Sequence, residues 1–148
     1  MSEAISVPVK LLNNKAIVPE NAYKGDAGID LRSTEEIILK PFERTLVPTG
    51  LAVAIPEGYA GFVLPRSGSA IKQGLSLVNA PGLIDSGYRG ELKCIAINMD
   101  PENSIHINVG DRIAQLVIMK VETASLVQVE ELDETQRGSG GFGSSGTE

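Results

Sequence analysis

Short segments in which apolar and polar residues alternate recur along most of this chain. In one of them, Val7, Val9 and Leu11 alternate with Pro8 and Lys10. Successive side chains of a β-strand point to opposite faces, so this pattern is typical of a strand with one buried face. The same criteria predict strands over residues 37–39, 45–55, 59–64, 75–78, 91–98, 105–109, 112–120 and 126–130.

Turn sequences separate these segments, for example Pro56-Glu57-Gly58 and Ser86-Gly87. Gly (16) and Pro (8) make up 24 of the 148 residues, which is above average usage. Residues 67–73 are the one helical candidate, with Ser67 as N-cap and Gly74 directly after the last turn. Many short strands with little helix predict an all-β fold, a sandwich, jelly roll or barrel, and the length suits one domain.

The end of the chain differs from the rest in composition. Residues 137–148 contain five glycines, which predicts a flexible Gly-rich tail after a β-rich domain over residues 1–136. Residues 138–143 match the G-x-G-x-x-G pattern, but no strand–turn–helix unit encloses them, so a dinucleotide fingerprint is not predicted. Two interpretations of the tail stay open: a mobile lid with glycine hinges, and a disordered end.

Charge and residue usage exclude several function classes. The net charge of -6 lacks the electrostatic pattern of a nucleic-acid binder, and no apolar run is long enough to cross a membrane. The N-terminal residues show no secretion signal, so we expect a cytoplasmic protein. With one Cys and one His, neither a disulfide nor a Cys/His zinc site is expected within a chain. Cys94 is predicted to be a small core residue, and His106 to lie on a polar strand face without a partner.

Two segments combine charged or hydroxyl residues with glycine. If residues 26–30 are a strand, Asp26 and Asp30 flank the bare Gly28 on one face and could hold a hydrated Mg²⁺; the alternative is a solvated face with a turn glycine. Arg66 beside the predicted start of the helix places a guanidinium, the Ser67 hydroxyl and free backbone N–H groups in one anion-binding corner. The alternative there is a capped helix with a surface arginine.

A third segment, residues 79–90, predicts a hairpin over 82–90 that closes near Ser86-Gly87. Its exposed backbone could bind a flat heterocycle, Asp85 could take a proton from water, and Tyr88 offers a ring face. The alternative is an ordinary turn with Asp at its start. In the tail, Arg137 could meet phosphate and Phe142 could stack on a base.

Taken in order, five segments resemble the five sequence motifs of the trimeric dUTP diphosphatases (dUTPases). They are residues 26–31, 65–68, 79–90, 110–116 and 137–146, so the resemblance spans nearly the whole chain. One departure is Ser69, where the family more often has Leu. The resemblance implies a distorted jelly-roll or β-clip-like single domain that forms a homotrimer with three shared active sites. It also implies hydrolysis of dUTP to dUMP and pyrophosphate with Mg²⁺, which limits uracil in DNA and supplies dUMP for dTMP synthesis.

The resemblance further implies roles for the residues around the phosphates. Asp85 resembles the base that activates the water attacking the α-phosphorus. Asp30 would orient the waters of a Mg²⁺ ion that is held mainly by the substrate phosphates. The residues implied to hold the phosphates are Arg66, Ser67, Gly68 and Gln115.

Around the nucleoside, the resemblance implies that Tyr88 packs against deoxyribose and leaves no room for a 2′-hydroxyl. Arg137 and Phe142 from a neighbouring chain would close over the γ-phosphate and the uracil. The residues implied to bind uracil are Asn79 and the backbone around Leu83, Ile84 and Asp85, with Lys93 also near the substrate. Backbone donors suit uracil O4, whereas cytosine N4 presents a donor of its own.

Two alternatives remain at this point. The related dCTP deaminases share the implied fold, although Asp85, Tyr88 and the Arg137/Phe142 tail fit dUTPases better. A non-catalytic β-roll that binds nucleotide or a partner protein is the alternative of another class. Asp85 argues against the second alternative, and turnover of dUTP separates the two classes.

Overall fold

A computed structural model of the chain describes residues 4–147. Residues 1–3 of the predicted domain and residue 148 of the predicted tail lie outside the described residues. The regular elements of the described chain are strands and one short helix, in the order β1 (Val9–Leu11), β2 (Ile29–Arg32), β3 (Ile37–Leu39), β4 (Arg44–Val53), β5 (Tyr59–Leu64), α1 (Ser67–Gln73), β6 (Leu75–Leu77), β7 (Gly82–Ile84), β8 (Glu91–Asn98), β9 (Ile105–Ile107) and β10 (Arg112–Lys120).

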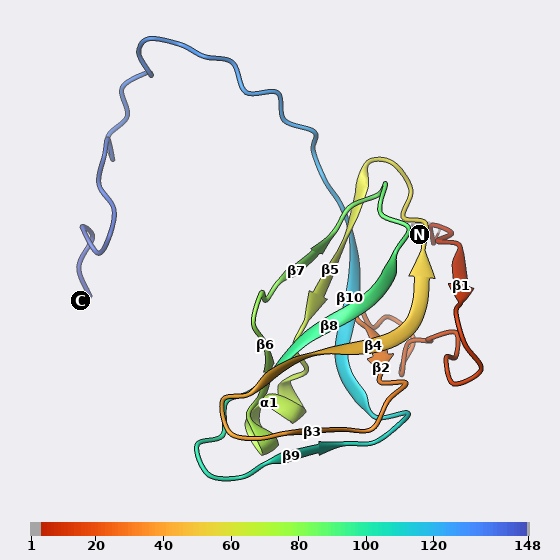
Figure 1. Ribbon diagram of the computed structural model, residues 1–148. Helices are drawn as coiled ribbons and strands as arrows, with labels where there is room; N and C mark the ends of the chain where they lie inside the picture. The colour runs from red at the N-terminus through yellow and green to blue at the C-terminus, as the bar shows by residue number, and fades with distance from the viewer. Residues whose placement is uncertain (1–3, 148) are drawn as a thin grey trace.

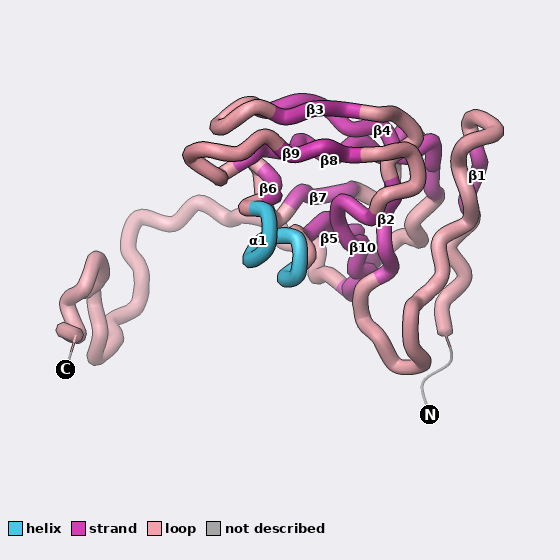
Figure 2. The backbone as a smooth tube through the Cα atoms, turned by 90° about the horizontal axis from the view of Figure 1, so that it is seen from below, coloured by secondary structure: helices cyan, strands magenta, loops and turns pink. Residues whose placement is uncertain are grey.

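Two four-stranded sheets and a two-stranded ribbon form the domain (Figure 1). The sheets have the orders β1-β4-β8-β6 and β2-β10-β5-β7, the ribbon pairs β3 with β9, and all the strand pairs are antiparallel. In Figure 2, β3, β9, β4 and β8 lie on one side of the domain and β2, β5 and β10 on the other. This architecture confirms the predicted all-β single domain of jelly-roll type.

The hydrophobic core lies between these layers and follows the alternation of the sequence. In β8, Leu92, Cys94 and Ala96 are all buried, while Lys93 between them is exposed. This confirms Cys94 as a core residue. Burial raises the pKa of its thiol to about 12, so the thiol is neutral and serves packing rather than chemistry.

Most predicted strands are confirmed, with β3, β5, β8 and β10 at the predicted bounds. The prediction of a strand over 126–130 is wrong, because no strand of the described chain lies after Lys120 and Leu126 is 97% exposed. After β10 the chain extends away from the domain and joins none of its sheets (Figure 1). The strand β2 overlaps only the last two residues of the possible strand over 26–30 and continues to Arg32.

The helix has the predicted bounds, and Gly74 follows it in the left-handed conformation with φ of 72°. The N-cap prediction is wrong. Arg66, not Ser67, occupies the N-cap position, and no side chain caps the helix. The Ser67 hydroxyl is therefore not used for capping. No helix among the described residues is long and apolar enough to cross a membrane.

Candidate active site

An open cavity of about 420 Å³ brings together five of the predicted site residues. It is lined by Asp30 from β2, Gln115 from β10 and the start of α1, together with the loop before β2: Ala22, Tyr23, Asp26, Ala27, Gly28, Asp30, Arg66, Ser67, Gly68 and Gln115. The register of β2 and β10 places Asp30 opposite Gln115, and β10 in turn pairs with the end of β5 that leads to Arg66. We call this the phosphate-side cavity.

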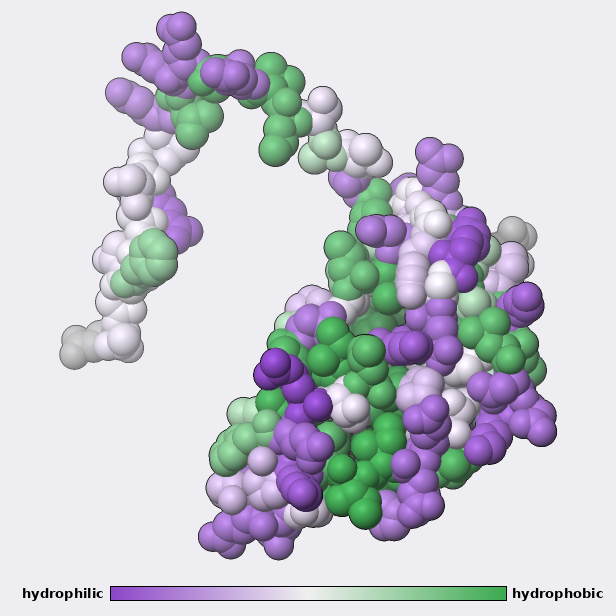
Figure 3. Space-filling model, in the orientation of Figure 1, coloured by the Kyte–Doolittle hydropathy of each residue, from purple (hydrophilic) through white to green (hydrophobic). Residues whose placement is uncertain are grey.

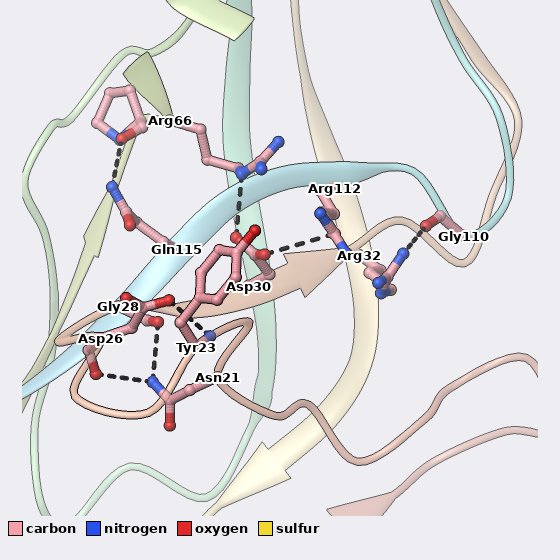
Figure 4. A network of polar contacts seen from close by, with 11 residues as sticks. Asn21, Tyr23, Asp26, Gly28, Asp30, Arg32, Arg66, Gly110, Arg112 and Gln115 are labelled. Carbon is pink, nitrogen blue, oxygen red and sulfur yellow. Dashed lines mark hydrogen bonds and ion pairs between the residues drawn. The ribbon is translucent and has the colours of Figure 1, made fainter. Parts of the chain in front are cut away.

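The charge centre of the cavity is Asp30, whose side chain is 17% exposed (Figure 4). Its Oδ1 accepts from Arg66 Nε at 3.0 Å, and its Oδ2 lies 3.4 Å from Arg112 Nε. Two guanidinium groups thus share the Asp30 carboxylate. Of the two, Arg66 lines the cavity, so its guanidinium is the cation that an anion would meet there.

Gln115 is held between two neighbouring backbones. Its Nε2 donates to the Pro65 carbonyl at 3.0 Å, and its Oε1 lies against Gly28, where an added Cβ would overlap it. A side chain at residue 28 would therefore displace the amide. This is the physical reason for glycine in the segment 26–31.

Asp26 and Asp30 both line this cavity, but they do not lie on one strand as the prediction assumed. β2 begins at Ile29, and Asp26 lies in the preceding loop, where its Oδ2 accepts from the Tyr23 N–H at 2.9 Å. Asp26 is therefore a loop residue rather than a strand residue. Among the described residues there is no group of three or more His, Cys, Asp or Glu side chains that could hold a metal ion.

A second cavity, of about 330 Å³, gathers Ile84, Tyr88 and Lys93 with Leu46, Glu91 and Ile95. The Tyr88 hydroxyl donates to the Glu91 carbonyl at 2.9 Å. An added Cβ at Gly90 would overlap the Tyr88 ring, so the glycine lets this ring lie against the backbone. We call this the nucleoside-side cavity.

The predicted hairpin over 82–90 is wrong in its pairing. β7 pairs with β5, through Val63 and Gly82 for example, whereas the following β8 belongs to the other sheet. The turn at 85–88 therefore connects two sheets, with the Tyr88 N–H donating to the Asp85 carbonyl at 3.1 Å. Because β7 is the last strand of its sheet, one of its edges keeps unpaired backbone donors and acceptors.

Three further predicted site residues lie on β7 or next to it. Leu83 is 60% exposed on the strand, and Asp85 follows its last residue and is also exposed. Asn79 lies against Gly82, since its Nδ2 is 3.4 Å from where a Cβ of that glycine would be. The exposed edge of β7, the Asp85 carboxylate and the nucleoside-side cavity thus occupy one region.

The tail extends away from the domain (Figure 1). Arg137 Nε donates to the carbonyl of Gly140 at 2.8 Å, and the Phe142 side chain is fully exposed. The described part of the G-x-G-x-x-G segment forms turns rather than a strand–turn–helix unit, as expected. Figure 3 shows apolar side chains on the arm between the domain and the tail and on the face of the domain in view.

His106 has a partner, contrary to the prediction. Its Nε2 lies 2.7 Å from Glu36 Oε1 on the β3–β9 ribbon, where both side chains are more than half exposed. The partner is 70 residues away in sequence, so local spacing gave no signal for it. Neither residue of this exposed pair lines the phosphate-side or the nucleoside-side cavity, and the pair supports no nucleophilic chemistry.

The predicted site residues therefore form three groups that the single chain keeps apart. The phosphate-side cavity does not include Asp85, Tyr88 or Lys93, and the tail lies away from the domain. Sequence reasoning missed Arg112, Asn21 and Tyr23. The signal for Arg112 was its place in the segment 110–116, next to Gln115 on the same strand.

Comparisons with known proteins agree on one family. The family model described as dUTPase matches residues 14–146. A curated relative from Rhodococcus erythropolis, named deoxyuridine 5'-triphosphate nucleotidohydrolase, is 54% identical over 99% of this chain and 89% of its own length. A relative of the same name from Nocardia farcinica is 53% identical over 99% of this chain and 88% of its own length.

Solved structures give the same result. The dUTPase of Staphylococcus bacteriophage 80alpha, solved with dUPNHPP, has a TM-score of 0.89 and 38% identity and covers 97% of this chain and 100% of its own. A mutant dUTPase from phage phi11 of S. aureus has a TM-score of 0.80 and 35% identity, covering 86% of this chain and 98% of its own. That phi11 structure is described as revealing the coordination of a structural Mg(II) ion.

Proposed function

Because this chain belongs to the dUTPase family, its reaction is the hydrolysis of dUTP to dUMP and pyrophosphate, and we propose how its residues perform it. The reaction removes a source of uracil in DNA and supplies dUMP for dTMP synthesis. The family match favours this activity over a dCTP deaminase and over a non-catalytic binding module.

The general base in this proposal is Asp85. Hydrolysis of a phosphoanhydride needs an in-line water, neutralisation of charge and a proton acceptor, and little covalent chemistry. The Asp85 carboxylate is exposed directly after the free-edged strand β7, where no charged partner occupies it among the described ion pairs. It takes a proton from the water that attacks the α-phosphorus, and pyrophosphate is the leaving group.

The triphosphate binds in the phosphate-side cavity. Arg66 supplies charge from its position beside Asp30, Ser67 supplies a hydroxyl that the helix does not use, and Gln115 supplies an amide that Pro65 and Gly28 position. Gly68 has open space around its Cα, which allows a phosphate to approach the backbone.

The residues present fit a Mg²⁺ ion that the substrate carries. Mg²⁺ keeps several waters and is commonly bound by one or two carboxylates together with substrate phosphates. Asp26 and Asp30 are the carboxylates of the cavity, and Asp30, which its ion pairs with Arg66 and Arg112 hold in place, would orient the waters of such an ion. When bound, Mg²⁺ neutralises charge on the phosphates.

The uracil is recognised by the free edge of β7. Backbone groups around Leu83, Ile84 and Asp85 match the uracil edge, and the Asn79 side chain adds further hydrogen-bonding groups. The deoxyribose packs on the Tyr88 ring, which its own hydroxyl bond to Glu91 holds in place, and Lys93 is on the same cavity wall.

The active enzyme is a homotrimer in this proposal, with each site shared between chains. The separation of the two cavities supports this assembly, as do Leu126 and Leu132 on the arm, which are 97% and 85% exposed. Apolar side chains so exposed are typical of an interface between subunits. The residues 137–148 then act as a lid on a neighbouring site, with Arg137 on the γ-phosphate and Phe142 stacked on uracil.

We also propose that the protein is cytoplasmic, because dUTP is formed and consumed in the cytoplasm. Neither nucleic acid nor a membrane is a proposed partner.

The experiment that tests the function is pyrophosphate release across a panel of nucleoside triphosphates, with wild type and Asp85→Asn. We expect turnover of dUTP with Mg²⁺, and ammonia release from dCTP would instead indicate a deaminase. Asp85→Asn keeps the shape of the side chain, so dUTP binding should persist while kcat falls about 10²–10⁴-fold, the usual contribution of a general base. A kcat near that of wild type would show that Asp85 is not the base.

A further inference from the structure

The loop over residues 21–28 forms a wall of the phosphate-side cavity and is fixed by its own hydrogen bonds. The Asn21 amide donates to two carbonyls, those of Asp26 at 2.9 Å and Gly28 at 3.0 Å. The Asp26 carboxylate accepts from the Tyr23 N–H at 2.9 Å, and the Asp26 N–H donates to the Tyr23 carbonyl at 3.1 Å. These four bonds fix the backbone that carries the Tyr23 ring.

Packing does not explain the position of this ring. Tyr23 is 78% exposed, and it lines the same cavity as Arg66 and Ser67 (Figure 4). In Figure 4 its side chain extends across the front of Asp30 on the side of Arg66. An exposed aromatic side chain on an ordered loop, directed over a polar cavity, is typical of a ligand contact rather than of a core residue.

We propose that Tyr23 is a further substrate-binding residue, whose phenol donates its O–H to a phosphate oxygen of the bound triphosphate; this rests on the proposed function. Among the described residues, Arg66 is the one cationic side chain that lines the cavity, and its guanidinium is paired with the Asp30 carboxylate, so the protein supplies at most one positive charge there for the phosphates. A triphosphate carries more negative charge than that. A neutral donor on the opposite wall adds a charge-assisted hydrogen bond without another desolvated cation.

Asn21 is a positioning residue in this scheme. It does not line the phosphate-side cavity, but both of its amide hydrogens hold the loop that presents Tyr23. Its carbonyl partner Gly28 is also the residue that Gln115 packs against. Loss of Asn21 should therefore weaken triphosphate binding through the placement of Tyr23 and Gln115.

The first test compares wild type, Tyr23→Phe and the control Tyr59→Phe in steady-state hydrolysis of dUTP and in inhibition by dUMP. Tyr59 starts β5 and packs against the hydrophobic core, outside both cavities. We expect Tyr23→Phe to raise KM for dUTP about tenfold, with kcat and the unfolding temperature near wild type, because one hydrogen bond to a charged group is lost. Inhibition by dUMP, which lacks the β- and γ-phosphates, should change much less.

The second test uses the absence of tryptophan from the chain, which makes Tyr23→Trp a single fluorescent probe. Addition of inorganic triphosphate with Mg²⁺ should change its emission, and inorganic phosphate should have a smaller effect. Asn21→Ala should raise KM as Tyr23→Phe does, and the double variant should cost less than the sum of the two single effects, since both act in part through the Tyr23 contact.

The outcomes separate this inference from the proposed function. A wild-type protein that releases no pyrophosphate from dUTP refutes the function itself. Wild-type turnover together with an unchanged KM for Tyr23→Phe, or with unchanged emission from Tyr23→Trp on adding triphosphate, refutes the role of Tyr23.

Discussion

Replacement of Gly28 by alanine tests how the cavity positions Gln115. Gly28 has no left-handed φ, so alanine can adopt its backbone conformation, and the new Cβ is the whole perturbation. That Cβ would overlap Gln115 Oε1 and lie 3.1 Å from Gln115 Cδ. The glutamine must rotate away, which breaks its bond to the Pro65 carbonyl.

The expected size of the effect follows from the contacts that are lost. The hydrogen bond to Pro65 is worth about 0.5–1.5 kcal/mol of folding free energy. A hydrogen bond from Gln115 to a charged phosphate is worth about 1.5–3 kcal/mol. At 1.36 kcal/mol for each factor of ten, kcat/KM for dUTP should fall about 10- to 150-fold, while the free energy of unfolding should fall by only about 1 kcal/mol.

A double-mutant cycle provides the control. Gln115→Ala removes the atoms that the new Cβ meets, so Gly28→Ala should cost nothing further in that background. The assay is kcat/KM for the four proteins, with thermal unfolding of each. If Gly28→Ala retains wild-type kcat/KM, or if the two effects add, the packing of Gln115 on Gly28 does not control phosphate binding.

Three further predictions follow from other parts of the chain. Tyr88→Ala should raise the ratio of UTP to dUTP turnover, because space for a 2′-hydroxyl opens beside the ribose; an unchanged ratio would place the selectivity elsewhere. A chain that ends at Gln136 should fold and bind dUTP weakly but turn over slowly, and undiminished kcat/KM would show that the tail has no role. The backbone N–H groups of Asn103 and Glu102 lower the pKa of Asp100 from its ordinary value of 3.8. The carboxylate therefore stabilises the fold above that pH and loses its effect as the pH falls through the lower folded value, so the difference in unfolding temperature between wild type and Asp100→Ala should be present at pH 7 and shrink below pH 3.8.

The parts of the fold that sequence predicted well are those that local chemistry determines. The alternation of Leu92, Cys94 and Ala96 is sufficient to place β8, because each of these side chains enters the core. The left-handed Gly74 ends the helix for an equally local reason. Such features need no knowledge of distant partners.

The errors arose where a partner far along the chain decides the outcome. The sequence predicts a hairpin between β7 and the residues that follow it, but β7 pairs with β5, which comes before it. Local spacing predicts no partner for His106 because Glu36, which directly precedes β3, is 70 residues away in sequence. The segment 126–130 has the pattern of a strand, yet it joins neither sheet of the described chain. Periodicity reports which residues prefer burial and does not report what covers them.

The candidate site also depends on distant partners, in this case residues of a second chain. Mixing two inactive variants tests this dependence. If each site takes Arg66 from one chain and Asp85 from another, trimers assembled from equal amounts of Arg66→Ala and Asp85→Asn chains contain some sites with both residues intact. Random assembly gives each position a wild-type residue half of the time, so about one quarter of the sites should be complete. If both residues belonged to one chain, every site would lack one of them. We therefore expect unfolding and refolding of the mixture to recover about a quarter of wild-type kcat, whereas each variant refolded alone stays inactive. A refolded mixture that is as inactive as its components would show that one chain supplies both residues, and the shared site would be wrong even though the two cavities lie apart.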